Sequence, residues 1–185
     1  MTVLAAVVTA AAAFAATNVD DLFVLMLLFG QARSGADRRR IVAGQYVGVA
    51  LLTAVSLAGA WGLGQIPDRY VRLLGLVPIA LGVREWLKRG AGEETPDSAL
   101  SVFAVAALTA ANGGDNIGVY LPLFTRMSEE GQGATLLVFA LLCGLWCFAG
   151  SRLAALPAVE KIITRHKDWL VPLVFLLLGM FILLG

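Results

Sequence analysis

The sequence predicts an all-α membrane protein with six transmembrane helices, arranged as two three-helix halves of opposite orientation. Three observations predict this fold: an apolar composition, six apolar windows long enough to cross a bilayer, and two polar interruptions that match each other. Apolar residues make up 59% of the 185, and charged residues make up only 15%. Soluble domains carry about 25% charged residues, so the composition indicates a protein that lies in lipid.

The apolar windows nearly fill the chain, and each has about the 20 residues that a helix needs to cross a bilayer. Since no soluble domain fits between them, we expect a single transmembrane domain over residues 1–185. The windows are continuously apolar, which favours helices over the alternating strands of a closed barrel. The Ala-rich start lacks a basic region, so we expect a retained first helix there and not a secretory signal. The six windows are 3–29, 41–65, 70–88, 100–125, 134–156 and 168–185.

The basic residues gather on one side of this predicted arrangement. Of the 14 Lys and Arg, eleven follow the first, third and fifth windows, and three lie on the other side. Because basic residues collect on the cytoplasmic side, we expect a multi-pass protein of the cell membrane with both termini outside. The eleven are Arg33, Arg38, Arg39, Arg40, Arg84, Lys88, Arg89, Arg152, Lys161, Arg165 and Lys167, and the three are Arg69, Arg72 and Arg126.

Polar residues interrupt the first and fourth windows at corresponding places. A shift of 95 residues puts Asp20-Asp21-Leu22 on Asp115-Asn116-Ile117, and it puts Phe29 on Phe124. The match predicts two related halves, residues 1–89 and residues 100–185. Because each half has an odd number of helices, the second must enter the membrane from the opposite side. Inverted repeats of this kind are common in transporters, which bind substrate at the repeat interface.

The carboxylates inside these windows predict a cation site. A charged group at the centre of a bilayer costs at least about 2.5–3.5 kcal/mol, and no Lys or Arg lies at similar depth in either window. Amide and hydroxyl oxygens flank the acids, and Gly113-Gly114 should open the fourth helix and free further carbonyls. Such a cage suits a divalent cation. The predicted ligands are Asp20, Asp115, Asp21, Asn18, Asn112, Asn116 and Thr17.

The acids are not equivalent in this prediction, because adjacent residues point about 100° apart around a helix. Asp20 and Asp115 form the first expected ligand pair. Asp21 is either a second ligand or a partner of Asn116 or Asn112.

At these residues the chain resembles a known family. The segments ATNVDDLFVL and ANGGDNIGVYLPLF resemble the cadmium-resistance transporters (CadD-like proteins) of the lysine-exporter superfamily. The resemblance covers essentially the whole chain and implies export of a divalent metal, cadmium first, from the cytoplasm. Relatives in the superfamily move manganese, calcium or amino acids, so manganese, zinc, calcium and a cationic amino acid stay open as substrates. The residues that match the motif positions are Asn18, Asp20, Asp21, Asn112, Asp115 and Asn116.

The two cysteines are further candidate ligands. Cys143 and Cys147 are the only ones in the chain and share a face of the fifth window. Thiolate suits cadmium, but a buried cysteine more often acts as a small apolar side chain, and we favour that interpretation. Gly44-x-x-x-Gly48 predicts close helix packing, within one chain or in a homodimer.

The expected mechanism is alternating access, with the metal and membrane lipid as partners and no cofactor or nucleic acid. The chain has no P-loop pattern, so an ion gradient must supply the energy if transport is active. Protons suit that role, because carboxylates that share a site hold a proton when the metal has left. An intramembrane aspartyl protease and a thiol electron carrier are alternatives from other classes. The amide-rich surroundings argue against the first, and Asp and Asn in place of Cys argue against the second.

Overall fold

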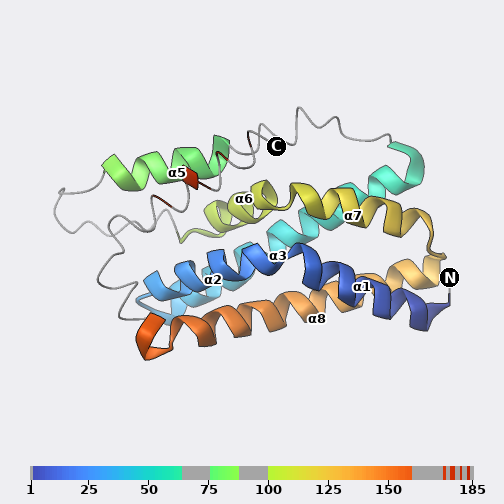
Figure 1. The fold of residues 1–185 in the computed structure, drawn as a ribbon, viewed down its shortest axis with the longest axis horizontal. Helices are drawn as coiled ribbons and strands as arrows, with labels where there is room; N and C mark the ends of the chain where they lie inside the picture. Colours follow the sequence, from blue (N-terminus) through green and yellow to red (C-terminus); the bar gives the residue numbers. More distant parts are fainter. Residues whose placement is uncertain are drawn as a thin grey trace.

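Helices form all the regular structure in the residues that the computed structural model describes (Figure 1). The described residues are 2–63, 76–87 and 100–159, with Leu173, Leu176, Leu177, Met180 and Leu183. This confirms the expected all-α class for the described part of the chain. In chain order the elements are α1 (Val3–Thr17), α2 (Val19–Gln31), α3 (Gly35–Ala58), the π-helical turn η1 (Gly59–Leu63), α5 (Leu76–Leu87), α6 (Val102–Asn112), α7 (Gly114–Thr125) and α8 (Glu129–Ala154).

The first apolar window contains a broken helix. α1 ends at Thr17 and α2 begins at Val19, and the two axes are bent by 59°. Asn18 between them has φ −117° and ψ 19°, so the helix axis bends there, although Asn18 N still donates to Phe14 O and Asn18 O still accepts from Leu22 N. Asp20 and Asp21 then occupy the first turn of α2, where a carboxylate interacts favourably with the positive end of the helix dipole.

A matching break divides the fourth window. α6 ends at Asn112 and α7 begins at Gly114, so both sides of this break lie 95 residues beyond those of the first. The opened turn expected at Gly113-Gly114 is therefore confirmed. Gly113 has φ −89°, a value open to any residue. Its missing side chain matters instead, because a Cβ there would run into Leu52 of α3.

Each broken helix packs against one of the two long helices. α3 lies against α6 and α7, whereas α8 lies along α1 and α2 and also contacts α3. In Figure 1 the pair α1–α2 runs opposite to the pair α6–α7, and α3 runs opposite to α8. The second helix of each expected half thus covers the broken helix of the other half.

Two glycines let α3 approach α6 closely. A Cβ on Gly44 would lie 2.5 Å from Val105 Cβ, and one on Gly48 would lie 2.5 Å from Thr109 Cβ. Real Cβ atoms do not come so close, so any side chain at either position would push the helices apart. The close packing expected at Gly44-x-x-x-Gly48 is confirmed, and in this structure it lies within one chain.

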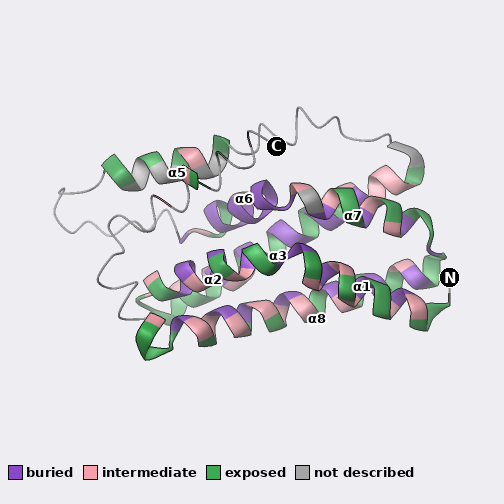
Figure 2. Cartoon of the chain, in the orientation of Figure 1, coloured by how far each residue is buried: buried purple, intermediate pink, exposed green. Residues whose placement is uncertain are grey.

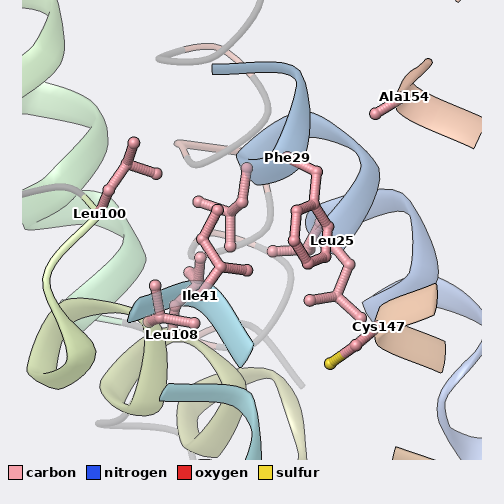
Figure 3. Close-up of a cluster of buried hydrophobic side chains, with 10 residues drawn as sticks. Leu25, Phe29, Ile41, Leu100, Leu108, Cys147 and Ala154 are labelled. Atoms are coloured by element: carbon pink, nitrogen blue, oxygen red, sulfur yellow. The ribbon is translucent and has the colours of Figure 1, made fainter. Parts of the chain in front are cut away.

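Buried side chains between these helices form two apolar clusters, which lie on the purple faces in Figure 2. The first joins α2, α3, α6 and α8, and Figure 3 shows it around Leu25, Ile41 and Leu108. The second joins α1, α3, α7 and α8, and the rings of Tyr120 and Phe139 in it have centroids 4.4 Å apart. Both clusters draw residues from both expected halves, so neither half has a separate core among the described residues.

Two described helices are long and apolar enough to cross a membrane, Gly35–Trp61 and Glu129–Ala154. The bent pair α1–α2 makes a third span when it is counted as one, and α6 is a shorter apolar helix. The expected third window (70–88) is described only over 76–87, and most of the sixth (168–185) lies outside the described residues. Six spans and an inverted repeat therefore stay predictions.

Several of the basic residues that we assigned to the cytoplasmic side share one end of the molecule. Arg38 Nη1 at the start of α3 donates to Ser151 Oγ near the end of α8 at 3.0 Å. Figure 1 shows the α2–α3 turn and the end of α8 at one end, and the α7–α8 turn, which carries Arg126, at the other. The sorting of charges agrees with this arrangement, while the orientation of the termini remains a prediction. Five other basic residues that we assigned to the cytoplasmic side lie outside the described residues: Lys88, Arg89, Lys161, Arg165 and Lys167.

The contact between α3 and α6 yields a prediction about stability. Replacing Gly48→Ala should lower the free energy of unfolding by about 1–3 kcal/mol, because the new methyl group overpacks against Thr109. Thermal unfolding of the purified protein in detergent measures the change. Gly133→Ala in α8 is the matched control, since a Cβ there meets nothing within 4 Å. Equal melting temperatures for the two variants would contradict the packing described here.

Candidate metal centre

Asn18, the residue at the first break, bonds directly to side chains of α7. It is only 2% exposed. Its Nδ2 donates to Phe14 O and to Tyr120 OH, both at 2.8 Å, while its Oδ1 accepts from Asn116 Nδ2 at 3.2 Å. Thr17 Oγ1 lies 3.1 Å from Tyr120 OH. These contacts join both broken helices, and we call Thr17, Asn18, Asn116 and Tyr120 the Asn18 cluster.

The backbone carbonyl at this break accepts hydrogen bonds from two donors. Asn18 O accepts from Leu22 N at 3.3 Å and from Trp146 Nε1 of α8 at 2.6 Å. The Trp146 ring also packs edge-on against Phe14, with centroids 5.5 Å apart. Leu22 N is the ordinary helical partner of this carbonyl, and the indole supplies a second hydrogen bond to its other lone pair. The indole N–H therefore stabilises the break from the opposite half of the chain.

A second buried link starts at Asp21, which is 3% exposed in the first turn of α2. Gln45 Nε2 of α3 donates to Asp21 Oδ2. The other end of the same amide, Gln45 Oε1, accepts from Thr109 Oγ1 of α6 at 2.7 Å. Thr109 O in turn accepts from Gly113 N at 3.0 Å, which closes the last turn of α6. We call Asp21, Gln45 and Thr109 the Gln45 bridge, and it joins the residues beside the two breaks.

The structure brings most of the predicted ligands to these breaks. Asp21 is buried and Asp20 is exposed, with Asp20 Oδ1 accepting from Asp21 N at 2.9 Å. Asp115 is the second residue of α7, as Asp20 is of α2, and the structure describes its backbone alone. Asp21 bonds Gln45, a partner that the sequence did not suggest. The predicted ligands with buried, described side chains are Thr17, Asn18, Asp21, Asn112 and Asn116.

The two cysteines lie inside the apolar clusters. Cys143 belongs to the cluster of Phe14 and Tyr120, and Cys147 belongs to the cluster of Leu25. Figure 3 shows Cys147 beside Leu25, among carbon side chains. Both are free thiols and both are buried. These surroundings are those of small apolar side chains, which is the interpretation that we favoured from the sequence.

Sequence reasoning missed three residues of the centre: Gln45, Tyr120 and Trp146. Gln45 carried a usable signal, because it is an amide inside the second window, where an unpaired polar group is costly. Tyr120 follows Asn116 by four residues and so lies on the same helix face. Trp146 had no such signal, since its partner is a backbone carbonyl that only the break makes available.

The candidate metal ligands buried at the breaks are oxygens of amides and hydroxyls and the carboxylate of Asp21. Such groups bind hard and borderline divalent cations. Among the side chains that the structure describes, no three His, Cys, Asp or Glu gather into a metal-binding group. A cation there would depend on neutral oxygens as much as on carboxylates.

The contact between Trp146 and Asn18 leads to a second prediction. Trp146→Phe keeps an aromatic ring beside Phe14 but leaves Asn18 O with one donor fewer. We expect a loss of about 1–3 kcal/mol in the free energy of unfolding, measured by thermal unfolding in detergent. Trp61→Phe is the control, because that side chain is 68% exposed. Equal melting temperatures for Trp146→Phe and Trp61→Phe would show that the indole N–H does not support the break.

Comparison with known proteins places this geometry in a family. No curated protein and no solved structure matches the chain. The model of one protein family, described as cadmium resistance transporter, matches residues 14–185 and so includes both breaks and every residue of the two polar clusters. The chain is therefore a membrane transporter and not an enzyme, and it belongs to the cadmium resistance transporter family.

Proposed function

We propose that this protein exports divalent metal cations, cadmium first, from the cytoplasm by alternating access. Membership of the family implies cadmium efflux. The observation that carries the mechanism is the meeting of both broken helices at one buried set of polar groups, joined by Asn18 and Gln45. A transporter needs a polar site that is closed to lipid and shared by two parts that can move relative to each other.

The proposed moving parts are the two halves of an inverted repeat. Its support is that both breaks have the same offset of 95 residues, that the broken helices run in opposite directions, and that α3 and α8 exchange partners between halves. Rocking of one half against the other would open the centre first to the cytoplasm and then to the outside. The basic end of the molecule is the proposed cytoplasmic entrance.

The proposed ligands are the residues that the sequence singled out, with a change of rank. Asp21 becomes the first carboxylate, because it is buried and bonds the Gln45 amide. Asp115 supplies charge from the other half, at the place in α7 that Asp20 has in α2. Asp20 remains a ligand in the proposal and reaches the cation when α2 turns. Amide oxygens of Asn18, Asn112 and Asn116 and the Thr17 hydroxyl complete the set.

The proposed ligands indicate that the substrate is a cation, but they do not select one metal. Oxygen donors accept manganese, zinc and calcium as well as cadmium, and a cationic amino acid would satisfy the same carboxylates. Family membership favours cadmium. Cys143 and Cys147 would sharpen that choice if they reached the centre, but their apolar surroundings support a packing role.

Growth under metal stress tests the proposed site. Cells without their own cadmium exporter should survive cadmium when they carry this protein. Asp20→Asn, Asp21→Asn and Asp115→Asn should each abolish protection, since the change removes a charge with little change of shape. Cadmium, zinc, manganese and cobalt should be compared in parallel.

Glu130→Gln is the matched control for these variants, because Glu130 is an exposed acid in the first turn of α8. It should protect as well as the unmodified protein. Full protection by both Asp21→Asn and Asp115→Asn would refute the site.

Proton coupling makes a separate prediction in liposomes. When the cation leaves, carboxylates that share a buried site should take up a proton, so metal and proton should be exchanged. An imposed pH gradient, with the higher proton concentration on the side that receives metal, should speed cadmium movement severalfold. The same vesicles with a collapsed gradient are the control. Transport at equal rates in both would leave passive movement as the mechanism.

A further inference from the structure

Gln45 of α3 bonds to residues beside both breaks. It lies in α3, is 1% exposed, and is flanked by the contact glycines Gly44 and Gly48. Its Nε2 donates to the Asp21 carboxylate of α2, and its Oε1 accepts from the Thr109 hydroxyl of α6. The Gln45 amide therefore connects the Asp21 carboxylate, which follows the first break, with the last turn of α6, which precedes the second break.

The close packing of α3 on α6 holds this amide in place. A Cβ on Gly48 would collide with Thr109, so nothing separates the two helices at this level. An amide that swung away would leave its polar ends in an apolar interior, at a large cost. Gln45 can, however, turn about its terminal side-chain bond, because that torsion has two broad minima. The turn exchanges the positions of its donor and acceptor ends.

A cation at Asp21 would favour the opposite orientation of the Gln45 amide. In the present structure the amide N–H faces the carboxylate. A cation bound to that carboxylate repels the N–H and attracts an oxygen. After a half-turn, Oε1 would face the cation and Nε2 would face Thr109, whose hydroxyl can accept as well as donate.

Thr109 has a ready alternative acceptor for its own proton. Other hydroxyls in these helices donate to the carbonyl four residues earlier, as Thr17, Thr53 and Ser56 do at 2.7–3.1 Å. Thr109 instead donates to Gln45. If the amide turns, the Thr109 hydroxyl can take the local acceptor that its counterparts use, the carbonyl of Val105. The Gln45 amide and the Thr109 hydroxyl would then each have hydrogen-bond partners in both states.

We propose that Gln45 is a ligand of the transported cation and that its amide turns when the cation binds at Asp21. The turn reverses the hydrogen bond to Thr109 and so communicates occupancy of the site to the last turn of α6. The inference rests on the proposed function, because it needs a cation at Asp21.

Cadmium binding to the purified full-length protein in detergent tests this role, with isothermal calorimetry as the readout. Gln45→Leu should bind about tenfold more weakly, since one oxygen ligand is lost. A Gln45 that only bonds the empty carboxylate predicts the reverse, because its removal would free Asp21 and leave binding equal or tighter. Gln132→Leu is the matched control, as its Nε2 donates to Phe124 O away from the two polar clusters, and it should bind within about twofold of the unmodified protein.

Infrared difference spectra give a readout that a structural role would not move. Cadmium should shift one glutamine side-chain carbonyl band, and the shift should be absent in Gln45→Leu and present in Gln132→Leu. If Gln45→Leu does not fold, Gln45→Glu replaces it, because the carboxylate keeps an oxygen for the cation, and it should bind at least as tightly as the unmodified protein.

The outcomes separate the two proposals. If the unmodified protein binds no cadmium, or if Asp21→Asn binds equally well, the proposed function fails and this inference fails with it. If Asp21→Asn loses binding but Gln45→Leu keeps it unchanged, the site stands and the role of Gln45 is refuted. Weaker binding by Gln45→Glu than by the unmodified protein, or a carbonyl band that persists in Gln45→Leu, would also overturn it.

Discussion

The structure depends on how the two helix breaks satisfy their polar groups without water. A helix that stops inside hydrocarbon leaves N–H and C=O groups that must find partners within the protein. At the first break the backbone of Asn18 keeps its local bonds to Phe14 and Leu22. The second half adds further partners: Tyr120 and Asn116 of α7 bond the Asn18 side chain, and Trp146 of α8 bonds its carbonyl. Contacts from the second half therefore support the bend in the first.

The same contacts suit the proposed transport site, because they would let it share one place with a stable core. Amides and hydroxyls that satisfy one another, as Gln45 and Thr109 do, can exchange those bonds for bonds to a cation at little net cost. The apolar clusters on both sides hold the helices together while the polar centre changes partners. Glycines 44 and 48 keep α3 and α6 close enough for one side chain to serve both. Helix packing thus determines which polar side chains lie within bonding distance of one another, and their charge determines which substrate they can bind.

The sequence predicted the composition of this centre better than its geometry. The 95-residue offset between the polar interruptions reappears in the ends of both breaks, because the residues that break a helix are local signals. The sequence marked the first window as interrupted by polar residues but did not reveal that the helix bends at Asn18, since the residues on both sides of it are helical. The ranking of Asp20 over Asp21 was not supported by burial, because the bend sets which of two adjacent side chains faces inward. Gln45 and Trp146 lie in other windows, and only tertiary packing brings them to Asn18 and Asp21.

The central claim is that a divalent cation binds oxygen donors between the two broken helices. X-ray absorption at the cadmium edge, on purified protein loaded with one equivalent of cadmium, tests it most directly because it identifies the atoms that touch the metal. The account predicts that oxygen atoms and no sulfur surround the cadmium. When Asp21 is replaced by Asn, the distances from cadmium to these oxygens should become more variable. A shell dominated by sulfur would place the metal at Cys143 and Cys147 and would contradict the account.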